Sequence, residues 1–208
     1  MLLEHAAAGR FPDADGEIEV VGSPGGVADV LMAFTGHFVL AADIDPDAVL
    51  VRVPEGDLAA PTAPAFVSWV AQRIGSYPAS HDALFVARAA PGDPLVGLRP
   101  VTDLDHPRVA RAHRYRTDVR AFTTTDDTGL LVLGRGLLQR WEMGIEVVPE
   151  ARSAGLGGRL ADAARRLLPP GTPIWAQVAP GNAASLRAVT TGGFRAVGAE
   201  VLFPRSAP

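Results

Sequence analysis

The segment that sets the fold class is Val147-Val148-Pro149-Glu150-Ala151-Arg152-Ser153-Ala154-Gly155-Leu156-Gly157-Gly158-Arg159-Leu160. Residues 137–148 are expected to form a strand that ends at Pro149, and the helical spacing beyond it predicts a helix over 153–168. The first N–H groups of a helix have no acceptor within the helix and lie at the positive end of its dipole. Glycines let a phosphate approach those N–H groups, and Arg152 adds a cation with a planar set of donors. The segment therefore predicts a pyrophosphate site.

The spacing of the glycines narrows the kind of pyrophosphate ligand. It is not the dinucleotide pattern G-x-G-x-x-G, because Leu160 occupies the third glycine position, and no Gly-Lys-Ser/Thr follows as in a P-loop. The segment resembles the acetyl-CoA signature of the GNAT N-acetyltransferase family, V-x-P-x-x-R-x-x-G-x-G. The matching residues are Val147, Pro149, Arg152, Gly155 and Gly157.

The resemblance implies a set of cofactor-binding residues. Backbone N–H groups would hold the CoA pyrophosphate at Arg152, Ser153, Ala154, Gly155, Leu156, Gly157 and Gly158. The strand edge at Val147 and Val148 would pair with the pantetheine arm, as an added strand does. From the residues alone, a glycine-rich helix start with no ligand is the alternative.

A second segment resembles the same family. Residues 175–186 read Trp-Ala-Gln-Val-Ala-Pro-Gly-Asn-Ala-Ala-Ser-Leu, and Gly193-Phe194 follows. The resemblance implies that Asn182 hydrogen-bonds the cofactor arm near the thioester, and that Ser185, one turn further on, faces the same ligand. Asn is also a good helix cap, and the two roles are compatible.

The family's chemistry implies direct attack of an amine on the thioester, without an acyl-enzyme. A backbone N–H near Val147 or Val148 would stabilise the tetrahedral oxyanion. Alternation along the strand places Glu142, Gly144, Glu146 and Val148 on one face. We expect Glu142 or Glu146 to act as the base; a surface edge or a structural pair with Arg is the alternative for each.

The sequence departs from the family at one position. The family often has a tyrosine seven residues after the asparagine, where it protonates the leaving thiolate, and this chain has Val189 there. Ser185, Tyr115 or water could replace that donor, or the thiolate could leave unaided. The further alternative is a non-catalytic CoA-binding or sensing module.

The order of expected elements gives the fold class and the domains. The first part is expected to hold a strand at 18–21, then a hairpin or two short strands over 27–44 around a turn at Thr35-Gly36. Helices are expected after Asp45 and over 63–74, and a strand at 84–87. Beyond a linker at 91–94 we expect a helix at 106–116 started by Asp105 and Pro107, strands at 119–125, 129–134, 137–148, 173–178 and 194–202, and helices at 153–168 and 182–191. This predicts an α/β fold with a mixed sheet, GNAT-like, with an additional N-terminal α/β segment. The expected domains are 1–94, accessory or a degenerate GNAT-like copy, and 95–208, the acetyltransferase.

Composition bounds the partners. The 208 residues include no cysteine and no lysine, so the protein can supply neither a thiolate nucleophile nor a lysine for a Schiff base. Residues 1–94 hold 13 acidic and 4 basic side chains, and 95–208 hold 10 and 15. The basic second half suits an anionic ligand, and two solvated surfaces are the alternative. The five histidines lack metal-ligand spacing, and the first residues lack signal-peptide features. We expect a cytoplasmic protein whose partners are acetyl-CoA and an amine acceptor. We expect no metal and no binding to nucleic acid or a membrane, and a homodimer is a possible assembly.

One basic stretch has two interpretations. Its members are Arg108, Arg111, His113, Arg114, Arg116 and Arg120. They lie on or just after the helix that, by the resemblance, borders the acceptor site, so they could favour an acidic acceptor or dock the acidic first half. A solvated helix face is the alternative.

Overall fold

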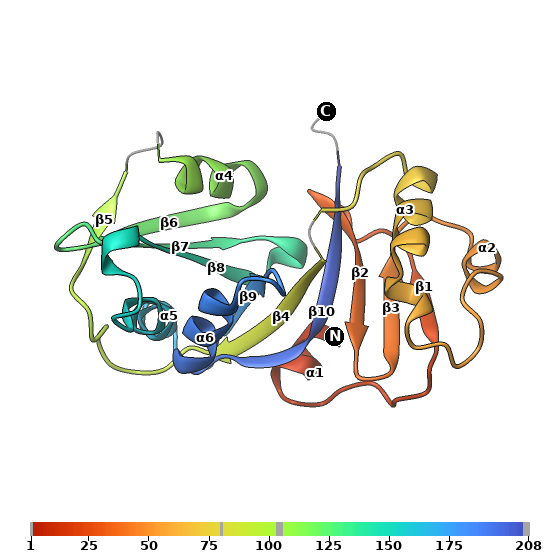
Figure 1. The fold of residues 1–208 in the computed structure, drawn as a ribbon, viewed down its shortest axis with the longest axis horizontal. Coiled ribbons are helices and arrows are strands. Elements are labelled where there is room, and N and C mark those ends of the chain that lie inside the picture. Colours follow the sequence, from red (N-terminus) through yellow and green to blue (C-terminus); the bar gives the residue numbers. More distant parts are fainter. Residues whose placement is uncertain (1, 80, 103–105, 206–208) are drawn as a thin grey trace. The chain divides into compact units, whose positions relative to one another are not determined.

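The computed structural model describes residues 2–79, 81–102 and 106–205 (Figure 1). The chain forms two compact units, one of Met1–Ala83 with Val197–Pro208 and one of Leu84–Ala196. Strands and helices occur in both units, and parallel and antiparallel strand pairs occur together. The fold is therefore the expected α/β class with a mixed sheet.

The first unit contains a four-stranded arrangement with helices. Its elements are α1 Leu2–Ala7, β1 Ile18–Val21, β2 Ala28–Phe34, β3 His37–Ala41, α2 Pro46–Leu50, the 3-10 turn η1 Ala60–Thr62, α3 Pro64–Arg73 and β10 Arg195–Pro204. The strand order is β1-β3-β2-β10; β1 runs parallel to β3, and the other neighbours are antiparallel. Leu31, Leu40, Val70 and Phe203 pack in one apolar cluster on this sheet.

The second unit contains the remaining six strands. Its elements are β4 His81–Arg88, β5 Leu98–Val101, α4 Pro107–Tyr115, β6 Thr117–Thr124, β7 Gly129–Arg135, η2 Leu137–Gln139, β8 Trp141–Val147, η3 Pro149–Ala151, α5 Leu156–Arg166, β9 Pro173–Val178 and α6 Ala183–Thr191. The order is β4-β9-β8-β7-β6-β5, antiparallel from β5 to β8, with β8 and β9 parallel.

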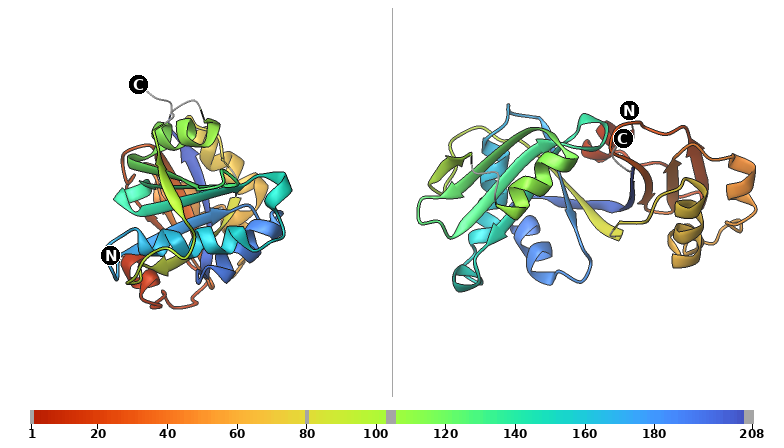
Figure 2. Two further views of the ribbon diagram at one scale, coloured as in Figure 1. Left: turned by 90° about the vertical axis from the view of Figure 1, so that its left-hand side faces the viewer. Right: turned by 90° about the horizontal axis from the view of Figure 1, so that it is seen from above.

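Helices cover both faces of this second sheet. An added Cβ at Gly144 on β8 would lie near α4 side chains, whereas the Cδ1 atom of Ile145 lies beside Gly157 on α5. Successive strand residues point to opposite faces, so α4 and α5 lie on opposite sides of the sheet, as Figure 1 shows. The α5 and α6 helices pack against each other (Figure 2).

Several expected elements are confirmed where local signals are strong. The hairpin turns at Gly36, which has φ of 70°. The side chain of Asp45 caps α2 and accepts a hydrogen bond from the Asp47 N–H. The strand at 173–178 is found with the same bounds. His106 caps α4 by accepting from the Arg108 N–H, and Asp105, the expected helix start, lies outside the described residues.

Three expectations about elements are wrong. The strand expected over 137–148 begins only at Trp141, because Leu138 and Gln139 have φ of 51° and 60° and form η2 instead. The helix expected from 153 begins at Leu156, since Ser153 and Gly155 are left-handed, with φ of 66° and 75°. The sequence interpretation also missed α1, whose six residues carry a weak periodic signal.

The compact units differ in their bounds from the expected domains 1–94 and 95–208. The 91–94 segment lies in a loop within the second unit, and most of β10 pairs with β2 in the first.

None of the helices in the described ranges has the length and apolar character needed to span a membrane.

Candidate functional site

One edge of β8 is open over its second half. On one side β8 pairs with β7 along all of its residues, from Trp141 to Val147. On the other side it pairs with β9 only at Trp141↔Ile174 and Glu142↔Trp175. Past these pairs the described residues provide no strand partner on the β9 side, so the backbone groups there can meet an extended ligand.

Alternation identifies which residues present their backbone groups at this edge. The Val148 N–H donates to the Thr128 carbonyl oxygen at 3.0 Å, on the β7 side. Neighbouring residues point the opposite way, so Val147 and Ile145 present their N–H groups to the open edge. Val147 and Val148 were both predicted to pair with the pantetheine arm, but only the N–H of Val147 faces the open edge. The N–H of Val148 already has an acceptor within the protein. Sequence reasoning missed Ile145, although the two-residue alternation of a strand, followed back from Pro149 through Val147, would have identified it.

A loop with irregular backbone joins β8 to α5. The side chain of Arg152 folds back, and its Nε donates to the Val147 carbonyl oxygen at 3.2 Å. Ser153 and Gly155 then adopt left-handed conformations, and Gly155 caps α5 without a side-chain hydrogen bond. Left-handed residues in a turn can bring neighbouring N–H groups toward one point, an arrangement that suits an anion.

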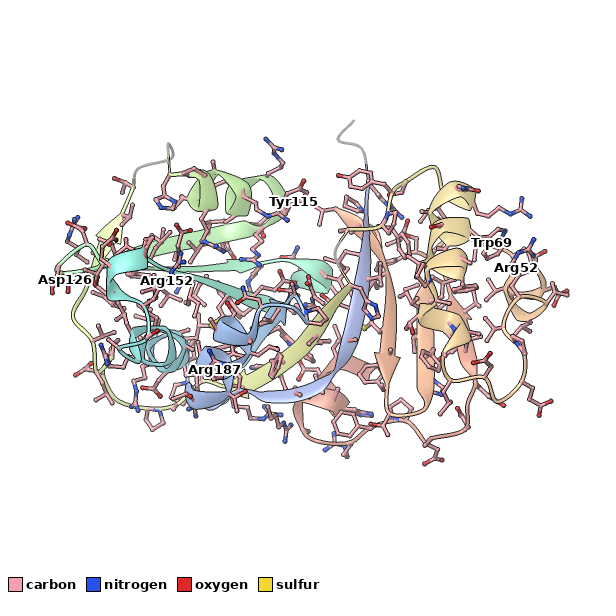
Figure 3. The ribbon with its side chains drawn as sticks, in the orientation of Figure 1. Arg52, Trp69, Tyr115, Asp126, Arg152 and Arg187 are labelled. Atoms are coloured by element: carbon pink, nitrogen blue, oxygen red, sulfur yellow. The ribbon has the colours of Figure 1, made fainter. Side chains whose placement is uncertain are left out.

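The N–H groups at the start of α5 are available to a ligand. The first hydrogen bond at this helix start runs from the Arg159 N–H to the Gly155 carbonyl oxygen, at 3.2 Å. For Leu156, Gly157 and Gly158, the described part of the chain offers no acceptor. Three unpaired donors at the positive end of a helix dipole suit a phosphate group. Arg152 and Asp126 lie at this end of the unit in Figure 3.

Two of the glycines also have a packing role. A Cβ on Gly157 would lie 3.0 Å from the Cβ of Ala188, and one on Gly158 would lie 3.0 Å from Cγ2 of Thr191. Both neighbours belong to α6, so these glycines let α5 and α6 approach closely. A Cβ on Gly155 would lie 3.6 Å from Nη1 of Arg159, an ordinary contact, so glycine is favoured there by its positive φ and not by lack of space.

The Asn182 segment forms the start of α6. The Oδ1 atom of Asn182 accepts from the Ser185 N–H at 3.0 Å, so Asn182 caps the helix as the alternative interpretation held. Ser185 is half-buried on the first turn. Val189, the position of the family's tyrosine, is only 2% exposed and packs in the core. A role for Asn182 or Ser185 toward a cofactor stays a prediction.

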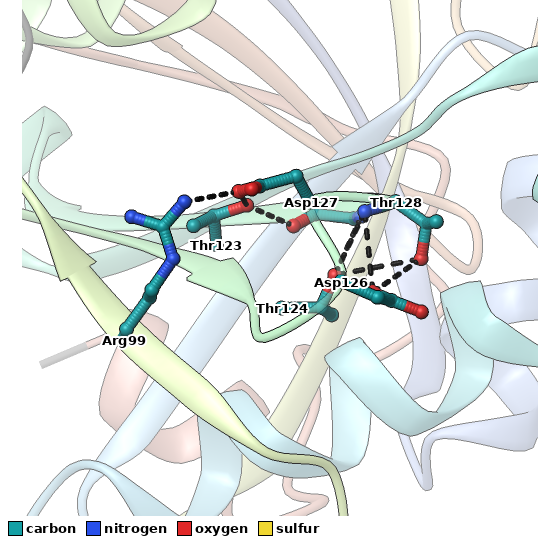
Figure 4. A network of polar contacts seen from close by, with 7 residues as sticks. Arg99, Thr123, Thr124, Asp126, Asp127 and Thr128 are labelled. Atoms are coloured by element: carbon teal, nitrogen blue, oxygen red, sulfur yellow. Dashed lines mark hydrogen bonds and ion pairs between the residues drawn. The ribbon is translucent and has the colours of Figure 1, made fainter.

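A network of threonines and aspartates supports the loop (Figure 4). In the turn between β6 and β7, Asp126 accepts hydrogen bonds from the hydroxyls of Thr124 and Thr128 at 2.6 and 2.8 Å. These bonds, with a third from the Thr128 N–H, lower the pKa of Asp126 to about 2. A Cβ on Gly129 would lie 2.8 Å from Cδ1 of Leu160, so this turn packs directly against α5.

Glu142 is a buried partner of two arginines. Its Oε1 accepts from Arg140 Nε at 2.8 Å and its Oε2 from Arg116 Nε at 3.0 Å, and the carboxylate is nearly inaccessible. Burial alone would raise the pKa of Glu142, but the charges of Arg140 and Arg116, with a hydrogen bond from Gln177, outweigh it and lower the pKa. The structure therefore favours the structural pair over the base for this residue.

Glu146 lies at the surface of the same strand face. Its Oε2 accepts from Arg108 Nε at 2.7 Å, and both side chains are about two-fifths exposed, at 43% and 42%. The hydrogen bond from Arg108 is the main cause that lowers the pKa of Glu146. Unlike Glu142, this carboxylate can be reached by a water molecule or an amine.

Two further members of the basic stretch contact aromatic rings. The guanidinium of Arg111 lies 5.4 Å from the ring centroid of Tyr115 at the end of α4, and that of Arg120 lies 5.0 Å from the Trp141 ring. Tyr115 is labelled in Figure 3 at this end of α4. In the described ranges, no three residues among His, Asp and Glu are grouped as a metal site would need.

Comparisons with known proteins find solved structures with a similar fold. No protein-family model matches the sequence, and no curated protein matches it. Among solved structures, a GCN5-related N-acetyltransferase from Kribbella flavida is 16% identical, with a TM-score of 0.44 over 70% of this chain and 65% of its own. An acetyltransferase of the GNAT family from Colwellia psychrerythraea is 12% identical, with a TM-score of 0.44 over 69% and 63%. The similarity thus spans just under two thirds of each of these chains.

Proposed function

We propose that this chain is a GNAT-type N-acetyltransferase that moves the acetyl group of acetyl-CoA to an amine of a small molecule or peptide. The proposal rests on the position of the open β8 edge next to the start of α5. The open edge of β8, with the N–H groups of Ile145 and Val147, leads directly into the loop that ends in the unpaired N–H groups of Leu156 to Gly158. A ligand with an extended amide-bearing arm and a diphosphate matches both parts, and CoA has both.

In this proposal the loop from Arg152 to Gly158 binds the pyrophosphate and the arm runs along β8. The amine nitrogen attacks the thioester carbonyl carbon, and the tetrahedral oxyanion accepts a hydrogen bond from the N–H of Ile145 or Val147. The C–S bond then breaks, and the thiolate of CoA leaves. Of the two predicted bases, Glu146 is the accessible one, and it takes the amine proton directly or through water. Ser185 or solvent protonates the thiolate.

The same proposal assigns residues 95–208 to the acetyltransferase domain and residues 1–94 to an accessory domain. The pairing of β10 with β2 gives these two parts of the sequence a shared sheet in the first unit. We place the protein in the cytoplasm, with acetyl-CoA and an amine as its ligands.

Calorimetry with CoA and acetyl-CoA tests the binding step, and release of free thiol with a panel of amines tests transfer. We expect both ligands to bind the full chain and thiol release to depend on the amine. Absence of binding by either ligand would contradict the proposal.

A non-catalytic CoA-binding or sensing module is the second candidate. The buried Val189 and the fully engaged Glu142 favour it, because both remove a proton-transfer group from the predicted set. Binding of acetyl-CoA without thiol release above the uncatalysed rate, across the whole amine panel, would support this candidate over the enzyme.

A further inference from the structure

Two guanidiniums converge on one point of β8 that has no side chain. A Cβ placed on Gly144 would lie 3.7 Å from Nη1 of Arg108 and 3.9 Å from Nη1 of Arg116. The two arginines come from opposite ends of α4, Arg108 from its first turn and Arg116 from its C-cap. Like charges that approach a common point repel each other, so this arrangement needs negative charge nearby.

Two carboxylates of the same strand face pair with these guanidiniums. Glu146 binds Arg108 through Nε, and Glu142 binds Arg116 through Nε. Because Glu142 also pairs with Arg140, one carboxylate is shared by two guanidiniums. These pairs occupy the Nε atoms of Arg108 and Arg116, and the Nη1 atoms that approach Gly144 lie outside them.

The Nη groups of both arginines are able to bind a ligand. In the described part of the chain only their Nε atoms have acceptors. The side chains of Arg108 and Arg116 are 42% and 17% exposed, so solvent reaches both. Guanidinium donors arranged in a plane match the two oxygens of a carboxylate.

We propose that Arg108 and Arg116 bind a carboxylate of the acceptor above Gly144, so that the acceptor is an amine that carries a carboxylate, such as an amino acid or a peptide C-terminus. This inference rests on the proposed function for the position of the reacting amine. Gly144 is adjacent to Ile145, whose N–H lies at the open edge where the thioester is placed, and one residue of strand spans about 3.3 Å. The held carboxylate orients the amine toward the thioester, and Glu146 lies on the same face to receive the proton.

Matched ligand pairs test this inference. The panel consists of L-amino acids and dipeptides, each compared with its C-terminal amide, which keeps the amine and removes the negative charge. Binding is measured by calorimetry with and without CoA, and transfer is measured by thiol release. We expect the acids to bind at least about 10-fold more tightly than the amides, as the loss of a charged hydrogen-bonded pair implies.

Two variants on α4 separate a binding role from a general charge effect. Arg108→Gln should raise the KM of the acid at least 10-fold and bring the acid-to-amide ratio close to one. Arg111→Gln removes the same charge from the same helix, but its guanidinium contacts Tyr115, so the ratio should stay as in the wild type. Rescue of the ratio by Arg108→Lys would be partial, because lysine keeps the charge without the planar donors.

The outcomes distinguish this inference from the proposed function. Acids that bind selectively without any thiol release would support the carboxylate site and count only against transfer. Thiol release with equal use of acids and amides would overturn the carboxylate site and leave the transferase standing. Failure of every acid in the panel to bind would also overturn it.

Discussion

The Nε atom of Arg152 donates a hydrogen bond to the carbonyl oxygen of Val147, five residues earlier, at 3.2 Å. This bond joins the end of the open β8 edge to the loop that precedes α5. It fixes the Nε side of the guanidinium, while the side chain stays exposed and its Nη groups can reach a phosphate. The one residue thus connects the two parts of the site that the proposal assigns to a single ligand.

Replacing Arg152 should weaken CoA binding. Arg152→Ala removes a cation and a charged hydrogen bond of about 1.5–3 kcal/mol, so the Kd for CoA should rise about 10- to 100-fold. Calorimetry on folded protein measures the change. Arg166→Ala, which removes a charge at the other end of α5, serves as the control and should leave the Kd unchanged. Equal weakening in both variants would contradict a specific contact.

Two glycines with left-handed backbones form a matched pair. Gly155 has φ of 75° and Gly171 has φ of 87°, and an added Cβ would clash at neither position. Gly155→Ala and Gly171→Ala should each lower the free energy of unfolding by about 1 kcal/mol, because alanine resists this conformation. Only Gly155→Ala should also raise the Kd for CoA, since Gly155 shapes the loop. Chemical denaturation and calorimetry on both variants check this.

Glu142 should matter for stability. Glu142→Gln leaves Arg140 and Arg116 without their buried counter-charge and should lower the free energy of unfolding by about 3–5 kcal/mol. Glu146→Gln breaks an exposed pair and should cost about 0–1 kcal/mol. Urea denaturation of both variants at neutral pH measures the difference. Equal losses in the two variants would show that burial of the pair has no part in the effect.

The pH dependence of stability should reflect Glu142. Its folded pKa lies below the ordinary value of 4.5, so it contributes stability that is fully present above pH 4.5 and is lost as pH falls through the folded pKa. Wild-type protein should lose stability below pH 4.5, and the Glu142→Gln variant should lose less over the same range. A parallel decline in both proteins would exclude this contribution.

Asp126 should titrate near pH 2. Its pKa of about 2, against an ordinary 3.8, means that the turn is stabilised above pH 3.8 and loses this contribution as pH falls to 2. NMR titration of the side-chain carboxyl carbon measures the midpoint directly. Asp126→Asn should speed amide exchange at Thr128 and Gly129, whereas Asp127→Asn, which loses an exposed pair with Arg99, should do so less. A midpoint near 4 would contradict the network.

Glu146 should affect the rate of transfer. Glu146→Gln should lower kcat at saturating substrates by about 100-fold or more, the usual contribution of a general base. Its pKa lies below 4.5, so it is ionised throughout the neutral range, and the variant should lower kcat/KM without moving its dependence on pH between 6 and 9. Glu150→Gln, in the exposed η3 turn, is the control and should keep kcat. Unchanged kcat in Glu146→Gln would assign proton removal to solvent.

The sequence alone determined the features that depend on neighbouring residues. The turn at Gly36, the caps at Asp45 and Asn182, and the strand at 173–178 follow from backbone preferences and local hydrogen bonds, which act over a few residues. The helix start with unpaired N–H groups after Pro149 is local for the same reason. These signals were enough to predict the mixed α/β class and the glycine-rich helix start that the proposal assigns to the pyrophosphate.

Tertiary structure decided what each candidate catalytic side chain does, because its partners come from distant segments. Glu142 and Glu146 have the same position in the strand pattern, yet Arg140 and Arg116 bury one while Arg108 leaves the other exposed. The open edge of β8 arises because β9 pairs with it only at its first two residues. A sequence pattern records spacing along the chain, whereas charge pairing, burial and strand register depend on which segments meet in space.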